Sequence, residues 1–219
     1  MSLILYGHPF SSYTQKALIA LYENDMPFEF RCLGPDTPRF GEEWLRLWPI
    51  GKFPVLLDGT RSVAESSIII EYLQLAYGGP VGLLPGDPGE ALEVRFRDRF
   101  FDLHVMSPVQ HAVGGAMSGD DGKRREALAD AVEKLERAYV WLEANLGGGP
   151  WATGEAFTLA DCAAAPALFY ADWTHPIAQT YPRLKAYRAR LLARPSYARA
   201  VDEARRYRPL FPLGAPDRD

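Results

Sequence analysis

The chain has 219 residues, 47% of them hydrophobic, and its 24 Lys and Arg against 28 Asp and Glu give a net charge of −4. This length fits one or two domains with a well-formed core, and the acidic balance argues against a nucleic-acid binder. Because the start lacks a basic segment and no apolar run approaches the roughly 20 residues of a spanning helix, we expect no secretory leader and no membrane partner. Two cysteines, Cys32 and Cys162, are too few for a disulfide framework, so we predict a cytoplasmic protein with reduced thiols.

The first third of the chain begins with a strand–helix–strand pattern. A short apolar run predicts a strand over 3–6, which Gly7-His8-Pro9 ends, and helical spacing of apolar residues follows over 12–22. A second strand is predicted over 28–33. Such a run implies two parallel strands whose connecting helix covers the sheet.

Two further strands and a helix complete this part. The run over 53–57 meets Asp58-Gly59, a strong hairpin turn signal, before a returning strand over 61–63. An apolar helical face follows over 66–77. The order is therefore β-α-β, an irregular or helical piece, and β-β-α, which predicts a thioredoxin-like mixed sheet flanked by helices.

A stretch rich in glycine and proline separates this part from the rest, since neither residue type suits a regular element. We therefore predict a thioredoxin-like α/β domain over 1–79, a linker over 80–89 and an all-helical domain over 90–219. Helical patterns cover 90–117, 123–146, 181–194 and 196–207, while the tail over 211–219 reads as irregular or loose.

One further helix start stands out in the second part. Thr158 can cap the backbone N–H three residues on, Asp161 can return the bond, and Phe157 can pack against the next turn. This capping pattern predicts a helix that begins at Thr158 and has a structural role.

The loop after the first strand is the most reactive place in a thioredoxin-like unit. Redox proteins of this fold carry Cys-x-x-Cys there, whereas this chain has Ser11-Ser12-Tyr13-Thr14, which cannot form a disulfide. The positive end of the helix still favours an anion at this place, and a serine hydroxyl can donate to a thiolate. The alternative is that Ser11 and Ser12 only cap the helix.

Two other short motifs fall at the same end of the predicted sheet. Phe53-Pro54 suits either a cis bend that turns the backbone of Phe53 toward an extended peptide or a trans proline at a strand edge. Glu65 and Ser66 could hold the ammonium and carboxylate of an amino acid, or simply cap the following helix. Together with the serine loop, these motifs predict a binding site for a thiol-containing peptide.

Four stretches, in this order, give the chain a family resemblance: LILYGHPFSSYTQKALIAL, WPIGKFPVLLDG, AESSIIIEYL and FTLADCAAAPAL. Over its whole length the chain resembles the cytosolic glutathione transferases, of the serine type that is similar to bacterial, zeta or tau members. The resemblance implies an enzyme with glutathione as co-substrate and without a metal. It also implies a homodimer.

The resemblance carries the family's site residues to this sequence. Ser11 takes the position of the thiol-activating serine, with Ser12 and Tyr6 as alternatives. The implied glutathione residues are Ser11, Lys52, Phe53, Pro54, Glu65 and Ser66, and the implied electrophile pocket contains Phe10, Tyr13, Met106, Gln110 and His111.

The implied activity is conjugation of the glutathione thiol to small hydrophobic electrophiles, in detoxification. One alternative is a glutathione-dependent isomerase similar to maleylacetoacetate isomerase, although that class usually has cysteine where this chain has Tyr13. Another is a non-catalytic glutathione-binding or scaffold protein. No metal site is predicted, because His104 and His111 are separated by Pro108 and lack a third ligand.

Overall fold

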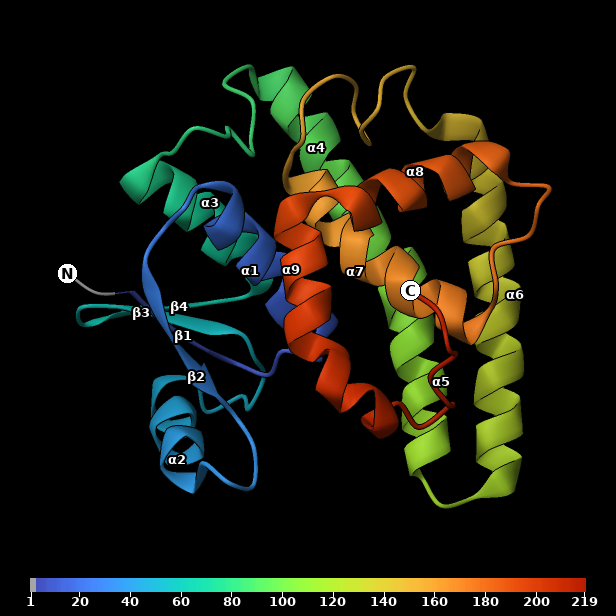
Figure 1. Ribbon diagram of the computed structural model, residues 1–219, viewed down its shortest axis with the longest axis horizontal. Helices are drawn as coiled ribbons and strands as arrows, with labels where there is room; N and C mark the ends of the chain where they lie inside the picture. The colour runs from blue at the N-terminus through green and yellow to red at the C-terminus, as the bar shows by residue number, and fades with distance from the viewer. Residues whose placement is uncertain (1–2) are drawn as a thin grey trace.

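The computed structural model describes residues 3–219 and combines a small mixed sheet with a larger set of helices (Figure 1). This confirms the predicted fold class, a thioredoxin-like α/β part followed by an all-helical part. Residues 1–2 of the predicted domain over 1–79 lie outside the described residues. The first part contains β1 (Leu3–Gly7), α1 (Ser12–Glu23), β2 (Phe28–Cys32), α2 (Pro38–Leu47), β3 (Val55–Asp58), β4 (Arg61–Ala64) and α3 (Ser66–Tyr77).

The sheet has the strand order β2-β1-β3-β4, in which β1 runs parallel to β2 and antiparallel to β3. Leu5 of β1 lies opposite Phe30 of β2 and Leu56 of β3, and Leu5 and Leu56 are fully buried. α1 connects the two parallel strands, as predicted. The piece between β2 and β3 proves to be a helix, α2, which begins with Pro38, a residue that suits the first turn because it needs no N–H there.

The second part is helical around one central helix. α7 carries buried side chains at every position from Leu159 to Trp173 and contacts α1 of the first part, α4 and η1. Its elements are α4 (Pro88–Phe100), η1 (Phe101–Met106), α5 (Ser107–Met117), α6 (Asp121–Asn145), α7 (Leu159–Thr174), α8 (Pro182–Ala193), α9 (Pro195–Ala204) and η2 (Arg205–Leu210). Within residues 3–219, no helix has both the length and the apolar character needed to cross a bilayer.

The long helix predicted over 90–117 is interrupted by a wider π turn, η1. Pro108 explains the interruption, because its ring would collide with the carbonyl group four residues earlier and it has no N–H to donate. The widened turn instead lets the backbone N–H of Ser107 reach the carbonyl oxygen of Asp102, which also accepts from the Ser107 hydroxyl at 3.0 Å. The helical path therefore continues from α4 through η1 into α5, which contains Pro108.

Several helix boundaries differ from the prediction by a few residues, and those of α4 and α9 have local reasons. α4 begins at Pro88 rather than 90, because the Asp87 side chain caps it by accepting from two backbone N–H groups at 2.9 Å. α9 ends at Ala204 instead of 207, and a 3₁₀ turn that contains Pro209 follows.

The C-terminal tail is irregular, as predicted, but it is not loose. Phe211 is 6% exposed and packs against Tyr170 and Trp173 of α7. Arg218 Nη2 lies 3.2 Å from a carboxylate oxygen of Asp172, also on α7. Aromatic packing and an ion pair between residues distant in sequence therefore hold the tail on the helical part.

The predicted capping pattern at the start of α7 is present and extends further than expected. Asp161 is fully buried, and one of its oxygens accepts from the backbone N–H and the hydroxyl of Thr158 at 2.9 and 3.1 Å. The other oxygen accepts from the backbone N–H of Ala152 at 2.8 Å and from the Tyr187 hydroxyl at 2.7 Å. One carboxylate thus joins the start of α7 to the preceding loop and to α8.

A second buried carboxylate cluster joins the two parts of the molecule. Lys16 of α1 is 1% exposed, and its Nζ lies 2.5 Å from Asp98 of α4 and 3.0 Å from Asp102 of η1. The same ammonium group donates to Ser67 of α3 at 2.8 Å, and Ser67 in turn donates to Asp98 at 2.8 Å. Every pair is close enough for charge-assisted hydrogen bonds.

We predict that Asp161→Ala lowers the free energy of unfolding by at least about 3 kcal/mol, because each buried donor left unpaired costs about 1–3 kcal/mol. Urea unfolding followed by circular dichroism measures the change. Asp120→Ala is the matched control: Asp120 caps α6 on the surface, so its loss should cost about 1 kcal/mol. Equal losses in the two variants would contradict the role given to Asp161.

We predict that Lys16→Met lowers the free energy of unfolding by about 3–5 kcal/mol, since it removes the buried cation that Asp98 and Asp102 share. The same unfolding measurement applies. Lys134→Met serves as control, because Lys134 forms an exposed pair with Asp130 on α6 and should contribute less than about 1 kcal/mol. A Lys16→Met protein as stable as the control variant would refute the prediction.

Candidate functional site

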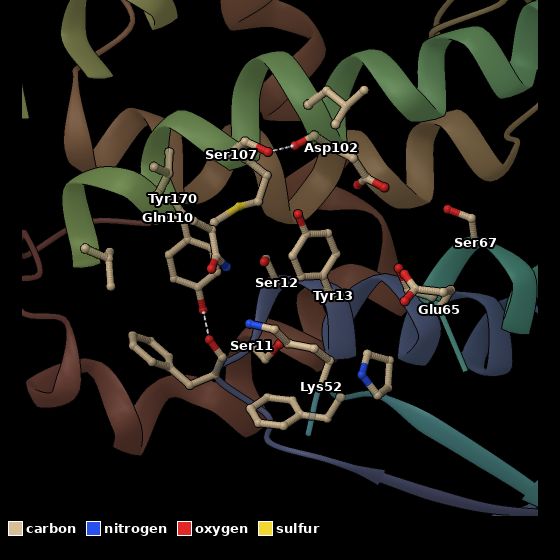
Figure 2. A pocket seen from close by; sticks show the side chains of 18 of the residues that line it. Ser11, Ser12, Tyr13, Lys52, Glu65, Ser67, Asp102, Ser107, Gln110 and Tyr170 are labelled. Carbon is tan, nitrogen blue, oxygen red and sulfur yellow. Dashed lines mark hydrogen bonds between the residues drawn. The ribbon is translucent and has the colours of Figure 1, made fainter. Parts of the chain in front are cut away.

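A cavity of about 930 Å³ lies between the sheet part and the helical part. The first turns of α1 and α3 and the loop before β3 form one side, and α4, η1, α5 and the residues around Phe211 form the other. Figure 2 shows Ser11, Ser12 and Lys52 facing the helix that carries Asp102 and Ser107. The first wall is largely polar around the serines, whereas the second is charged at α4 and mostly apolar toward α5 and Phe211.

Ser11 lies in this cavity and also caps α1. Its Oγ accepts from the backbone N–H of Thr14 at 3.3 Å, and its own N–H donates to the carbonyl oxygen of His8 at 2.9 Å. A hydroxyl that accepts a hydrogen bond still has its proton to donate. Ser11 can therefore cap α1 and donate to a ligand at the same time, and its capping role does not argue against a role in binding.

Ser12 lines the same cavity in a different environment. It is 5% exposed, and its hydroxyl has no hydrogen-bond partner among residues 3–219. A buried hydroxyl without a partner is costly unless a ligand or water completes it. Ser12 therefore stays an alternative donor.

Two expected residues do not reach the cavity. The Tyr6 hydroxyl instead accepts from Arg31 at 2.6 Å and donates to Glu43 of α2 at 3.1 Å, away from the serine loop. His111 points toward α6, with Nε2 3.7 Å from a carboxylate oxygen of Asp130. For His111 the reason is helix rotation. Each residue turns the helix by about 100°, so Gln110 faces the cavity and the next residue does not. The structure therefore places Tyr6 and His111 outside the cavity, in contrast to the prediction.

The loop before β3 contributes its backbone to the cavity. The Phe53–Pro54 peptide is cis, both residues line the cavity, and the β3 ladder begins only at Val55. Lys52 lines the cavity as well, and Trp44 of α2 donates to its carbonyl oxygen at 3.0 Å. α2 thereby holds the loop that carries the cis proline.

Glu65 and Ser66 lie at the start of α3, on the cavity wall. Glu65 has a φ of 70°, a left-handed conformation that costs a residue with a side chain about 1–3 kcal/mol. Such strain persists where the surroundings require it, often at a ligand site. Ser66 is 6% exposed and is the first helical residue, where backbone N–H groups lack partners within the helix.

Four of the five residues expected around the electrophile line the cavity: Phe10, Tyr13, Met106 and Gln110. Sequence reasoning missed further parts of this wall. Leu210 ends η2, and Phe211 and Pro212 belong to the tail, whose docking depends on contacts with α7 that no local pattern reveals. Within residues 3–219 no three histidine, cysteine or acidic side chains gather closely enough to hold a metal ion.

Sequence reasoning also missed two ion pairs at the cavity. Arg95 of α4 donates twice to Glu71 of α3, at 2.9 and 2.8 Å, and Arg99 lies 3.3 Å from Asp102. All four residues line the cavity. The spacing of the arginines on α4 was a weak signal, because charges four apart are also typical of a solvated helix face.

Comparison with known proteins agrees with this geometry. Residues 5–81 match the family described as glutathione S-transferase, N-terminal domain, and residues 125–190 match the corresponding C-terminal domain. A probable maleylacetoacetate isomerase from Vibrio cholerae is 29% identical, over 93% of this chain and 97% of its own. A glutathione S-transferase from Pseudomonas putida is 31% identical, over 73% and 70%.

A solved structure of a glutathione S-transferase is also similar to this chain. A glutathione S-transferase from Methylobacterium radiotolerans, in complex with glutathione sulfonate, superposes with a TM-score of 0.77. It is 32% identical to this chain, and the match covers 92% of this chain and 95% of that one. With both domains matched and the site formed between them, the chain belongs to the glutathione S-transferase family of enzymes.

Proposed function

We propose that this protein activates the thiol of glutathione and conjugates it to small hydrophobic electrophiles. One observation carries the proposal: the serine loop, the backbone before a cis proline and the start of α3 converge on one cavity, whose opposite wall is apolar around Met106 and Phe211. The related structure with bound glutathione sulfonate supports the choice of ligand.

Ser11 would stabilise the thiolate. A free thiol has a pKa near 8.5, and a hydrogen bond from the Ser11 hydroxyl together with the positive end of α1 would lower the pKa of the bound thiol. The hydroxyl is available for this bond because the hydrogen bond from Thr14 uses only its oxygen. The thiol proton leaves to solvent, and the thiolate then attacks an electrophile held beside it.

The remaining polar residues would hold the ends of glutathione. The Glu65 carboxylate suits the γ-glutamyl ammonium, while the Ser66 hydroxyl and N–H suit its carboxylate. The backbone of Phe53, which the β3 ladder leaves free, would pair with the cysteinyl residue as an added strand does. Lys52 would take the glycyl carboxylate.

The opposite wall favours conjugation over isomerisation. Met106, Leu103 and Phe211 give it an apolar part, and the arginines that line the cavity, Arg95 and Arg99, already pair with carboxylates. A neutral electrophile fits such a wall better than a dicarboxylate such as maleylacetoacetate. The isomerase nonetheless stays the second candidate, because the relative from Vibrio cholerae is named as one.

We also propose that the protein acts in the cytoplasm as a homodimer. α3 and α4 expose several apolar side chains: Leu75 of α3 is 86% exposed, Leu92 and Phe96 of α4 are 68% and 47% exposed, and Ile68, at the cavity, is 53% exposed. Exposed apolar side chains on the two helices would suit an interface. A second copy of this chain is the occupant that suits them, because the same side chains would meet across a two-fold axis.

We predict that Ser11→Ala lowers kcat with chlorodinitrobenzene about 100-fold, the loss expected when one preorganised donor to a developing charge is removed. Retention on glutathione resin should persist, because the other contacts remain. Steady-state kinetics and resin binding measure the two effects.

Ser12→Ala and Tyr6→Phe are the matched variants, and each should keep most of the turnover. If either loses it in place of Ser11→Ala, the assignment of Ser11 is wrong. Wild-type protein that binds the resin and turns over no electrophile would favour the scaffold alternative, whereas failure to bind would refute the glutathione site.

We predict that Leu92→Glu converts the dimer to a monomer, because it places a charge within the proposed apolar interface. Sedimentation velocity reports the state. Val140→Glu is the control, since Val140 is 55% exposed on α6, outside α3 and α4, and should leave the dimer intact. A wild-type protein that sediments as a monomer would contradict the prediction.

A further inference from the structure

The serine loop between β1 and α1 is held by hydrogen bonds along its whole backbone. The N–H of Ser11 donates to the carbonyl oxygen of His8 at 2.9 Å, and the N–H of Phe10 donates to the His8 ring nitrogen Nδ1 at 3.2 Å. The Thr14 hydroxyl accepts from the N–H of His8 at 3.4 Å, and the carbonyl oxygen of Ser11 accepts from the N–H of Gln15 at 2.9 Å. These partners all belong to the loop itself or to α1.

The two carbonyl groups directly before Ser11, those of Pro9 and Phe10, are held by a pair of buried side chains. Gln15 of α1 is 1% exposed and donates from Nε2 to the carbonyl oxygen of Pro9 at 2.9 Å. Tyr170 of α7 is 3% exposed and donates its hydroxyl proton to the carbonyl oxygen of Phe10 at 2.8 Å (Figure 2). Gln15 also donates to the Tyr170 oxygen at 3.3 Å, so the two side chains form one network.

Tyr170 joins the helical part of the molecule to the serine loop. Within residues 3–219, every other hydrogen bond to this loop comes from the loop or from α1. Burial raises the pKa of Tyr170 above its ordinary value, against the opposing effects of the Gln15 hydrogen bond and the charge of Arg208, so the hydroxyl keeps its proton. Without this donor the carbonyl group of Phe10 would be left unpaired at a buried place, which is costly and favours a shift of the loop.

A shift of the loop would act on the thiol through Ser11. Ser11 directly follows Phe10 in the chain, so its hydroxyl moves with that peptide group. A hydrogen bond depends steeply on its distance and angle, and a misplacement of about 1 Å at a reacting centre can cost about 100-fold in rate. Because the other hydrogen bonds of the loop would limit the shift, we expect a smaller loss.

We propose that Tyr170, held by Gln15, is a positioning residue that fixes the serine loop and thereby sets how strongly Ser11 activates the glutathione thiol. The helical part would then take part in the activation step, although the serine belongs to the sheet part. This inference rests on the proposed function and deepens it.

Tyr170→Phe tests the inference, because it removes the hydroxyl and keeps the ring, which packs edge-on against Phe10. We expect the pKa of the enzyme-bound glutathione thiol to rise by about one unit, toward the value of about 8.5 of a free thiol. The ultraviolet absorbance of the thiolate, titrated against pH, measures this shift. The readout needs no electrophile, so it does not depend on the place of Tyr170 in the cavity wall.

Turnover gives the second readout. The kcat with chlorodinitrobenzene should fall about tenfold at a pH below the pKa of the bound thiol, because one pKa unit changes the thiolate fraction about tenfold. It should recover at a pH above the raised pKa, and the KM for glutathione should stay within about twofold. Burial, followed by the charge of Arg206, lowers the pKa of His8, so His8 stays neutral in all variants at neutral pH and above.

Tyr197→Phe is the matched control. Tyr197 of α9 is also buried, but its hydroxyl has no hydrogen-bond partner in the described part of the chain, 3–219, so this variant should change neither the thiol pKa nor kcat. Gln15→Met removes the other half of the network and should raise the same thiol pKa. It decides the matter if Tyr170→Phe does not fold.

Two outcomes with folded Tyr170→Phe overturn the inference: an unchanged thiol pKa, or a loss of kcat that is equal at every pH. If the wild-type protein forms the thiolate and turns over chlorodinitrobenzene in the same experiment, the proposed function stands in either case. Wild-type protein that forms no thiolate and turns over no electrophile overturns both proposals.

Discussion

One buried lysine fixes the relation of the two halves of the molecule. Lys16 needs carboxylate partners, since an unpaired charge in the interior is very costly, and it finds them in Asp98 and Asp102 across the domain boundary. Hydrogen bonds to a charge are directional, so this contact defines a position where apolar packing would allow some sliding. Because Ser67 belongs to the same cluster and follows Ser66, one set of bonds places both walls of the cavity.

Features that depend on neighbouring residues could be predicted from the sequence. The strand–helix–strand start, the turn at Asp58-Gly59 and the capping pair of Thr158 and Asp161 are local signals, and the structure contains all of them. The π turn could not be predicted, because apolar residues over 101–106 have the same spacing as in an α-helix. The docking of the tail depends on Asp172, more than 40 residues away.

The residues of the candidate site also fall into those that could be predicted from the sequence and those that could not. Ser11, Phe53 and Glu65 each stand at the end of a strand or the start of a helix, and the sheet topology brings such positions together. His111 and Tyr6 were misplaced because their orientation depends on helix rotation and on a competing cluster around Arg31. The pairing of Arg95 with Glu71 needs the packing of α3 on α4, which periodicity does not give.

The π turn η1 belongs to only one wall of the cavity, the one proposed to contact the electrophile, and not to the wall formed by α1 and α3. A π turn holds about one residue more than an α turn, so the loss of one residue within Phe101–Met106 would restore regular winding and leave Gln110 facing the cavity. Such a deletion changes no residue of α1 or α3. A change of length at this one turn therefore alters the cavity wall between Asp102 and Met106 and leaves the wall formed by α1 and α3 as it is.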